Sequence, residues 1–432
     1  MELGGASTLL LAVCVTALIF LMTWISSNKR KNMPPGPAPL PFVGNILQVN
    51  MKELPKSLLK LAKVHGDIFT VQLGTRTVVL LHGYDTVKEA LVDNADVFSN
   101  RGSAATVKML FNDYGIIFSN GERWKVMRRF SLATLKNFSM GKRSIEERIL
   151  EESQHLMEEF RKTEGSPCDP TYPLTLAVSN TICSIVFGEH FDYSNQTFLG
   201  LLEAIKEIFT LARSRSLQLF NNFPRLFRHL SGPQKLLQKV DKVKAFVKDK
   251  VNEHEKTLDK DCPRDFIDCF LLKMEEEKDD PNTEFHFENL FVSVINLFVA
   301  GTETTSTTLK RSLTILTKYQ DVLAKVQEEI DNVIGRDRCP SIEDRNRMSY
   351  MEAVIHEIQR VSDIAPLGIA HATAQTTIFR GYTIPKVGRI LQLYNILSLS
   401  IISVIHLIEM FGYLHNIAQT KILKNKTKKT SS

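Results

Sequence analysis

A long central stretch with helical spacing constrains the fold most. From about Glu122 to Ile334, most windows of the sequence show the apolar spacing of a helix. Segments rich in proline, glycine and charge interrupt it, which predicts loops at "EGSPCDPTYP", "NNFPRLF", "KDCPRD" and "EKDDPNTEF". Strand character is confined to "DIFTVQL" and "RTVVLLHG" around a turn at Gly74, and to "FRGYTIP"; a short helix is expected from Tyr84 to Asn94. The sequence therefore predicts a mainly α fold with a small β-sheet region.

Composition excludes several classes of protein. The chain has 432 residues, of which 43% are hydrophobic, so it can bury one large core or two ordinary ones. Its formal charge of +6 suits an anionic membrane surface or an acidic protein better than a nucleic acid. The six cysteines are scattered without a CxxC pair, which predicts neither a disulfide framework nor a zinc site. A reducing, cytosol-facing environment fits this cysteine usage.

The N-terminal segment predicts a membrane anchor. No residue from Leu3 to Ile25 is charged, and about 20 apolar residues can cross the hydrocarbon of a bilayer as a helix. A cleavable signal peptide is the alternative, but such signals begin with positive charge, whereas here Glu2 precedes the run and "KRK" at 29–31 follows it. This charge bias places the globular part in the cytosol. We expect residues 1–27 to form one transmembrane signal anchor.

Residues 28–45 combine positive charge with a run of prolines, "MPPGPAPLPFVGN", from Met33 to Asn45. Proline cannot continue a helix and favours stiff, extended chain. The segment is expected to be a semi-rigid hinge between the anchor and the globular part, although the same composition fits any proline-rich linker.

The stretch "INLFVAGTETTSTTL", from Ile295 to Leu309, begins like a buried helix and continues with a glycine, an acid and threonines. Gly301 inside a helix costs about 1 kcal/mol relative to alanine, and threonines lower helix propensity further. A glycine lets a helix approach a flat ligand closely, and a threonine hydroxyl bonded to a backbone carbonyl can open the helix and hold a water. Glu303 beside Thr304 could then relay protons. A kinked core helix with its acid at the rim is an equally weighted alternative.

Two further helical motifs carry residue pairs. In "HEIQR", Glu357 and Arg360 are three apart and share one helical face as an ion pair. In "GERWKVMRRF", Trp124 and Arg128 are four apart and could offer an indole N–H and a guanidinium to a carboxylate or phosphate. Ordinary amphipathic helices contain such pairs too, so each motif is weak by itself.

Arg101 in "SNRG" and His371 in "GIAHAT" add a cation and a hydrogen-bond donor, which alone indicate ordinary loop polarity. The order of the motifs is more specific. The anchor, "PPGPAPLPFVGN", "GERWKVMRRF", "AGTETT", "HEIQR" and "FRGYTIPK" resemble a microsomal cytochrome P-450 of the vertebrate xenobiotic- and lipid-metabolising group. The resemblance runs continuously from the N-terminus to Lys386. It implies the mainly α P-450 fold, with residues 46–386 as an incomplete, C-terminally truncated catalytic domain.

The resemblance implies roles for the residues of these motifs. Thr304 and Glu303 would serve oxygen activation and proton delivery on the distal side of a b-type haem, next to Ala300 and Gly301. A structural ion pair behind the haem would be formed by Glu357 and Arg360. The haem propionates would be held by Arg101, Trp124, Arg128 and His371. The substrate pocket would be lined by segments 103–118, 209–220, 296–300 and 364–369.

The resemblance also implies an activity and a location. A P-450 is an oxidoreductase that hydroxylates lipophilic small molecules such as xenobiotics, fatty acids or steroids with O2. Its electrons come from an NADPH-dependent flavoprotein reductase, with cytochrome b5 as a second donor, and Lys125 and Arg129 could dock an acidic redox partner. The implied location is the endoplasmic reticulum membrane, with the globular part facing the cytosol. No nucleic-acid partner is expected.

The sequence departs from the family where the haem iron should be bound. The family's ligand cysteine lies in Phe-x-x-Gly-x-Arg-x-Cys-x-Gly downstream of the "GYTIPK" strand, and no cysteine follows Lys386 here. The nearest match, "NVIGRDRCPS", places Gly335 four residues before Cys339 but has Asn332 and Asp337 where the motif needs phenylalanine and arginine. We therefore predict that no cysteine of this chain is a metal ligand, which argues against haem binding.

Residues 387–432 form a different kind of segment. No residue from Ile390 to Ile408 is charged, and the lysines of "KILKNKTKK" follow. A second membrane-associating helix and an unstructured, aggregation-prone tail are both open interpretations. Our hypothesis is that altered splicing or a frame change replaced the family's C-terminal portion after Lys386; a continuous, conventional exon structure across that codon would contradict it.

Two functions remain. The first is a membrane-anchored haem monooxygenase that hydroxylates a lipophilic molecule. The second is a catalytically incompetent, truncated form that at most occupies the membrane or the reductase. The absent ligand motif favours the second for this chain.

Overall fold

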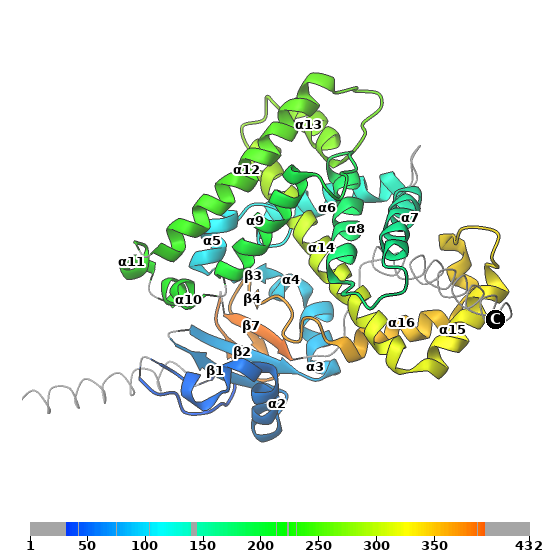
Figure 1. Ribbon diagram of the computed structural model, residues 1–432. Helices are drawn as coiled ribbons and strands as arrows, with labels where there is room; N and C mark the ends of the chain where they lie inside the picture. The colour runs from blue at the N-terminus through cyan, green and yellow to red at the C-terminus, as the bar shows by residue number, and fades with distance from the viewer. Residues whose placement is uncertain are drawn as a thin grey trace, which may run out of the picture. The chain divides into compact units, whose positions relative to one another are not determined.

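The computed structural model describes residues 32–41, 43–74, 76–102, 104–139, 145–212, 214–222, 224–229, 231–386 and 388–393 (Figure 1). The predicted anchor and residues 394–432 of the predicted tail lie outside these residues. Within the described ranges, no helix has both the length and the apolar character needed to cross a membrane. Helices dominate, and the strands form two small sheets. The predicted fold class, mainly α with a small β-sheet region, is confirmed.

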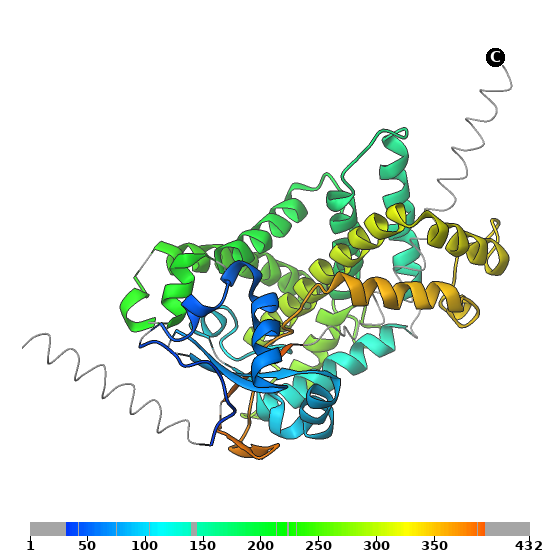
Figure 2. The same ribbon diagram turned by 90° about the horizontal axis from the view of Figure 1, so that it is seen from below.

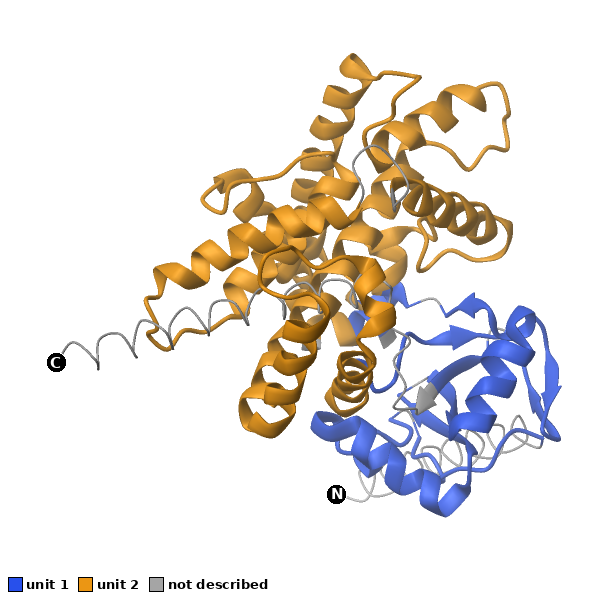
Figure 3. Cartoon of the chain, turned by 90° about the vertical axis from the view of Figure 1, so that its right-hand side faces the viewer, with its two compact units in different colours: residues 1–105, 219–226, 365–394 blue, residues 106–218, 227–364, 395–432 orange. Residues whose placement is uncertain are grey.

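Two compact units divide the chain (Figure 3). Unit 1 takes residues 1–105, 219–226 and 365–394, and unit 2 takes residues 106–218, 227–364 and 395–432. Both sheets belong to unit 1, and the long helices from residue 121 to residue 362 belong to unit 2. The segment predicted as one catalytic domain thus consists of two units whose segments alternate along the chain.

A five-stranded sheet in the order β1-β2-β7-β4-β3 forms the centre of unit 1. Its strands are β1 (Ile68–Leu73), β2 (Arg76–His82), β3 (Asn100–Arg101), β4 (His371–Ala372) and β7 (Arg389–Leu393). β1 and β2 pair antiparallel across the turn at Gly74, whereas β2 and β7 pair in parallel. A separate hairpin is formed by β5 (Thr377–Phe379) and β6 (Tyr382–Ile384). The strands predicted in "DIFTVQL", "RTVVLLHG" and "FRGYTIP" are confirmed.

Both faces of this sheet are covered by apolar side chains of unit 1. On one face, α3 (Tyr84–Lys88) and the π-helical turn η3 (Glu89–Asp93) contribute to a core of Ile68, Val79, Leu81, Val87, Ala90, Phe98 and Ile390. On the other face lies α2 (Leu54–His65) (Figure 2), with a core of Leu58, Ala62, Phe69, Val71 and Leu80. Because successive side chains of a strand point to opposite faces, a strand buried on both faces needs a continuous apolar run, as in "VVLL" of β2.

Strand β7 lies in the segment that the sequence assigned to a divergent tail. Its residues pair with β2 from Val78↔Arg389 to His82↔Leu393, and with β4 through His371↔Ile390. Ile390 is buried between these strands. Residues 389–393 therefore complete the sheet of unit 1.

The proline-rich segment has no helix from Pro34 to Pro39, and it is bonded to the sheet. The amide of Thr70 in β1 donates to the carbonyl of Pro35 at 2.7 Å. The buried Asn45 side chain accepts from the Gln72 amide at 2.7 Å and donates to the carbonyl of Pro37 at 3.2 Å. A Cβ on Gly36 would lie 1.9 Å from the Thr70 carbonyl oxygen. The described part of the predicted hinge is thus fixed on unit 1.

Unit 2 contains the predicted helical region. Its long helices are α6 (Gly121–Ser139), α7 (Ile145–Lys162), α8 (Thr171–Val186), α9 (Gln196–Ala212), α12 (Ser231–Thr257), α13 (Phe266–Glu276), α14 (Phe287–Lys318), α15 (Gln320–Val333) and α16 (Ser349–Ser362). The chain passes between the units within α5 (Ala105–Phe111), α10 (Arg215–Asn222) and α11 (Pro224–Phe227). An apolar core joins α8, α14, α15 and α16. The helices break at "EGSPCDPTYP", "KDCPRD" and "EKDDPNTEF", as predicted, whereas Pro224–Phe227 of "NNFPRLF" forms α11, and the break between α8 and α9 at residues 187–195 was not predicted.

Candidate functional site

The glycine- and threonine-containing stretch lies in the middle of α14, which is one continuous α-helix. A Cβ on Gly301 would lie 2.5 Å from Cδ1 of Ile182 in α8, so this glycine allows two helices to approach closely. The hydroxyl of Thr304 donates to the carbonyl of Ala300 at 2.6 Å. The predicted bond from threonine to the backbone is therefore confirmed, and the helix remains closed around it.

Three predicted site residues share one exposed face of α14. Ala300, Glu303 and Thr304 are exposed, and their spacing of three and four places them side by side. The other side of the helix is buried, where Thr302 approaches the hydroxyl of Ser179 in α8 at 3.5 Å. One side of α14 thus packs in unit 2, and the other presents a small residue, a carboxylate and a hydroxyl.

Glu357 and Arg360 form the ion pair that their spacing predicts. In α16, Nε and Nη2 of Arg360 donate to the two carboxylate oxygens of Glu357 at 2.7 and 2.6 Å. The bidentate hydrogen bond lowers the pKa of Glu357 and raises the pKa of Arg360. Both side chains are more than half exposed, so the pair contributes little to stability where it stands.

Trp124 and Arg128 also meet as their spacing predicts. They lie on α6, and Cζ of Arg128 is 5.4 Å from the centre of the Trp124 ring, a cation–π contact. Arg128 is exposed and Trp124 is half-buried. The indole N–H and the guanidinium can therefore be offered to one anion from one helical face of unit 2.

Arg101 and His371 lie opposite each other in unit 1, on the paired strands β3 and β4. Nδ1 of His371 is 2.7 Å from the carbonyl oxygen of Phe98, which can only accept, so Nδ1 carries the proton. Burial, and then the Arg101 charge, lower the pKa of His371. In the neutral ring Nε2 is an acceptor, so His371 donates to an anion only as an imidazolium.

A small apolar cavity lies within unit 2. Its volume is about 30 Å³, and all of its lining side chains are apolar. Four of them lie in segments predicted to line a pocket: Leu110, Phe111, Phe209 and Val299. Six others, on α9, α12 and α14, were not predicted: Ile205, Ile208, Val240, Val243, Phe291 and Ile295. Their helical spacing identifies them as inward-facing, but not as cavity-lining.

Two asparagines of α14 hold the loop that follows α5. The side-chain oxygen Oδ1 of Asn296 accepts from the amides of Ile116 and Ile117 at 3.0 and 2.9 Å. Oδ1 of the buried Asn289 accepts from the Gly115 amide at 2.7 Å. The residues are seven apart, so they share a helical face. Sequence reasoning missed this contact; the signal available was two amide side chains at heptad spacing in an apolar helix.

The described cysteines do not have the surroundings of a metal-binding thiolate. Burial raises the pKa of Cys183 well above its ordinary value, and burial raises the pKa of Cys269 to about 11. Cys168, Cys262 and Cys339 are exposed. Cys339, the nearest sequence match to the family's ligand, follows α15 in a surface loop, as predicted.

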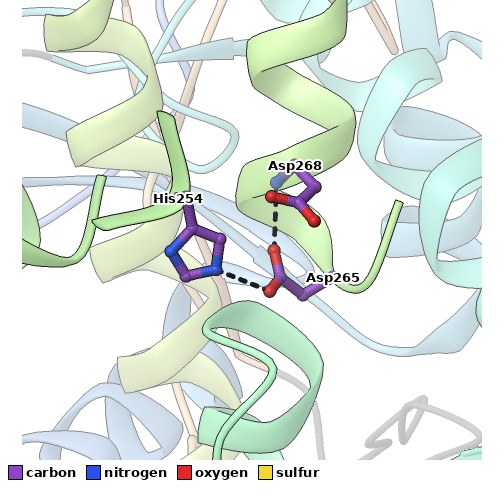
Figure 4. Close-up of side chains that lie close together, drawn as sticks. All are labelled: His254, Asp265 and Asp268. Carbon is purple, nitrogen blue, oxygen red and sulfur yellow. Dashed lines mark hydrogen bonds and ion pairs between the residues drawn. The ribbon is translucent and has the colours of Figure 1, made fainter. Parts of the chain in front are cut away.

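A buried histidine and two aspartates join α12 to α13 (Figure 4). Nε2 of His254 is 2.7 Å from Oδ2 of Asp265, and its Nδ1 is 2.7 Å from the carbonyl oxygen of Lys250. Oδ1 of Asp265 accepts from the Asp268 amide at 3.0 Å and so caps α13. Asp268 in turn accepts from the Arg264 guanidinium at 2.7 and 2.9 Å. The atoms of these three residues that could bind a metal are already hydrogen-bonded, so the cluster fits a structural link between α12 and α13, called the lock below. Sequence reasoning missed it.

This lock predicts a pH-dependent stability. Burial alone would lower the pKa of His254, but the hydrogen bond and charge of Asp265 outweigh it, so the pKa of His254 is raised. The stabilisation is complete below about pH 6.5, the ordinary value, and is lost as the pH rises through the folded pKa. We expect the difference in unfolding free energy between wild type and His254→Gln to be largest near pH 6 and to shrink toward pH 9. Urea titrations across this pH range measure the difference in unfolding free energy. A difference that grows with pH would contradict a protonated His254 paired with Asp265.

Comparison with known proteins shows which family the chain resembles. The family profile described as Cytochrome P450 matches residues 34–397. The chain is 51% identical to human Cytochrome P450 2C8 over 377 residues, which cover 87% of this chain and 77% of that protein. It is 51% identical to rat Cytochrome P450 2C23 over 387 residues, covering 89% and 78%, and 50% identical to mouse Cytochrome P450 2B19 over 379 residues, covering 88% and 77%. The profile match includes strand β7 and thus extends beyond Lys386.

Proposed function

Because the chain belongs to the cytochrome P450 family of monooxygenases, we propose that it presents the distal and propionate-side groups of a haem site without an iron-binding cysteine. The observation that supports this most directly is the occurrence of an exposed acid and hydroxyl on α14 together with described cysteines whose pKa is raised by burial, or which are exposed in loops. The family's own activity is the O2-dependent hydroxylation of lipophilic molecules.

The exposed face of α14 fits the distal side of a haem. Ala300 is small enough for a flat ring to approach, and Thr304 and Glu303 place a hydroxyl and a carboxylate beside it. When bound, haem would supply the activation of O2. The hydroxyl of Thr304 already donates to Ala300, so its oxygen remains free to accept a proton-carrying water. Glu303, being exposed, can exchange protons with solvent.

The residues expected to hold propionates form two sets, one within each unit. Arg101 and His371 belong to unit 1, and Trp124 and Arg128 belong to unit 2. Trp124 offers its indole N–H next to the Arg128 guanidinium, and Nε2 of His371 can donate next to Arg101 once the ring is protonated; both arrangements suit a carboxylate. An approaching propionate would favour the imidazolium form of His371, because a nearby negative charge raises the pKa of a histidine.

The described cysteines do not fit the role of the iron ligand. A thiolate needs a neighbouring cation or metal to lower its pKa, and the described cysteines show raised values or lie in exposed loops. We therefore propose that the 432-residue chain is inactive as a monooxygenase. It would lie at the endoplasmic reticulum membrane as a non-catalytic form that can still contact the NADPH-dependent reductase or cytochrome b5, with basic α6 residues such as Lys125 and Arg129 exposed for that contact.

Spectroscopy on the purified chain tests this proposal. The full chain is incubated with haemin, reduced, and exposed to carbon monoxide, in parallel with human Cytochrome P450 2C8 as a matched, 51% identical control. We expect the control alone to give a thiolate-type Soret band. A thiolate-type band from this chain would contradict its proposed inactivity, and Cys339→Ser would then show whether the surface-loop cysteine is responsible.

The cavity in unit 2 supports a lipophilic substrate class for the family site. All of its lining side chains are apolar, and α14 contributes three of them at spacings of four, Phe291, Ile295 and Val299. This row leads along α14 toward Ala300 and Glu303. Because its volume is only about 30 Å³, the cavity supports the apolar character of a ligand and not its size.

A further inference from the structure

Two histidine rings of unit 2 meet between a helix and a loop. His155 lies on α7, and His190 lies in the loop between α8 and α9. The centres of the two rings are 4.7 Å apart, and the ring planes are inclined by 31°. The imidazoles come from separate segments of the chain, so a group that held both would join α7 to this loop.

A buried carboxylate orients one of these rings. Nε2 of His190 is 2.9 Å from Oε2 of Glu152, whose side chain is only 4% exposed. The hydroxyl of Tyr193 donates to the other oxygen of the same carboxylate. Because a carboxylate accepts hydrogen bonds, Nε2 of His190 carries a proton, and Nδ1 of the neutral ring presents a lone pair. Glu152 therefore fixes both the orientation and the tautomer of His190.

The backbone beside His190 is fixed as well. The Asn180 side chain in α8 accepts from the Phe191 amide at 3.1 Å and donates to the Phe191 carbonyl at 2.7 Å. Nδ2 of Asn180 also lies 3.3 Å from Nε2 of His190, but that ring nitrogen donates to the closer Glu152. The ring is thus held in place before a ligand arrives, which lowers the entropy cost of binding.

This arrangement matches the surroundings of a zinc-bound histidine. Such a histidine usually donates its other ring N–H to a carboxylate, which orients the ring and increases its basicity. In agreement, the hydrogen bond to Glu152 raises the pKa of His190, although burial opposes the shift. With Zn–N distances of about 2.0–2.1 Å and tetrahedral angles, two imidazoles on one zinc ion have ring centres about 5 Å apart. The observed separation of His155 and His190 is 4.7 Å.

A further carboxylate and solvent reach the same place. Asp192 is exposed, and its charge contributes to the raised pKa of His190, so the two side chains lie near each other. Oδ1 of Asp192 accepts from the Ser194 amide at 2.7 Å, which leaves Oδ2 for an ion. The His190 side chain is 32% exposed, and His155 is half-buried, so an ion can enter from water. Imidazole nitrogens with a carboxylate oxygen suit zinc better than magnesium or calcium.

We propose that Nδ1 of His190 and a ring nitrogen of His155 bind a zinc ion. Asp192 and water complete the coordination, and Glu152 supports His190 without touching the metal. The bound ion joins α7 to the loop between α8 and α9. This site is separate from the lock, whose polar atoms are already hydrogen-bonded to one another and to Arg264. It uses no cysteine and no haem, and it does not depend on the proposed function.

Calorimetric titration of the untagged full chain with Zn²⁺, in phosphatidylcholine nanodiscs at about pH 8 where the rings are neutral, tests the site. We expect wild type to bind zinc and His155→Gln to bind it at least about tenfold more weakly, since even the loss of a supporting group outside the metal costs about tenfold to hundredfold. The control is His356→Gln, because His356 is exposed on α16 and also pairs with a glutamate, through Nε2 at 3.3 Å from Glu352. This control should bind zinc within about twofold of wild type.

Further variants separate the ligands from their support. Glu152→Gln should weaken zinc binding about tenfold to hundredfold, and zinc should raise the thermal midpoint of wild type but not of His155→Gln. Should Glu152→Gln lose native circular dichroism, His155→Gln decides, because it changes a half-buried residue on the helix surface. No zinc binding by wild type, or full affinity in His155→Gln, would overturn the proposal. So would equal binding of Mg²⁺, or zinc binding that is lost in Asp265→Ala and kept in His155→Gln.

Discussion

Replacing Asp265 with alanine is expected to lower the free energy of unfolding by roughly 3–5 kcal/mol, the cost of breaking a buried charge pair from one side. Asp265 is completely buried and contacts His254 in α12 while capping α13. The loop at Gly188 closes over it, since a Cβ there would lie 2.5 Å from Oδ2 of Asp265. Without the carboxylate, His254 loses its hydrogen-bonded counter-charge and keeps only Asp268, which is already paired with Arg264, and the first turn of α13 loses its acceptor.

Urea unfolding of the full chain at about pH 6, where His254 is protonated, measures this loss. Asp265→Asn retains an oxygen for the Asp268 amide, so it should recover the cap, worth about 1 kcal/mol, but not the ion pair. Asp280→Ala is the matched surface control, because Asp280 is exposed and bonds only locally to the Asn282 amide; its effect should stay within about 0.5 kcal/mol. Equal effects at Asp265 and Asp280 would show that the pair does not hold the helices together.

Replacing Gly115 with alanine is expected to destabilise unit 2 by about 2–5 kcal/mol. Gly115 has a φ of +80°, which costs an L-residue about 1–2 kcal/mol. In addition, a Cβ would lie 2.6 Å from Cγ1 of Val292 and 2.7 Å from Oδ1 of Asn296, and such overpacking costs about 1–3 kcal/mol. The displaced Asn296 would also release the amides of Ile116 and Ile117.

The Gly335→Ala variant separates the cost of a positive φ from the cost of overpacking. Gly335 has a similar φ of +78°, but no atom lies within 4 Å of its Cβ position. The Gly335→Ala variant should lose only the unfolding free energy that the positive φ costs, about 1–2 kcal/mol. Chemical denaturation gives both values, and limited proteolysis should show faster cleavage near residues 113–118 in the Gly115 variant alone. Equal losses of unfolding free energy in the two variants would mean that the loop around Gly115 moves aside and that the added methyl group does not press on α14.

The parts of the site that depend on local spacing could be predicted from the sequence. Residues three or four apart on a helix are neighbours, so the Glu357–Arg360 pair, the Trp124–Arg128 contact and the bond from Thr304 to Ala300 follow once the helix is recognised. The hairpin strands follow in the same way from alternation and turns.

Contacts between distant segments could not be predicted in this way. The sequence shows Gly301 to be unusual but not that Ile182 is its near neighbour, and it gives no sign that Asn289 receives the Gly115 amide. Tertiary packing determines such partners, and the hydrophobic periodicity of the sequence carries no information about them. The strand at 389–393 was missed for a related reason, because an apolar run beside a serine-rich segment fits a strand and a membrane segment equally well.

The parallel pairing of β2 with β7 sets the order in which unit 1 can fold. Arg389 is synthesised more than three hundred residues after its partner Val78, so one hydrogen-bonding edge of β2 has no β7 to cover it while most of the chain is made. Pairings between such distant residues form slowly, and an open apolar strand edge recruits other chains. The short segment 389–393 therefore decides whether a nascent chain completes its sheet or aggregates, and we expect chaperone dependence to rise sharply when it is altered.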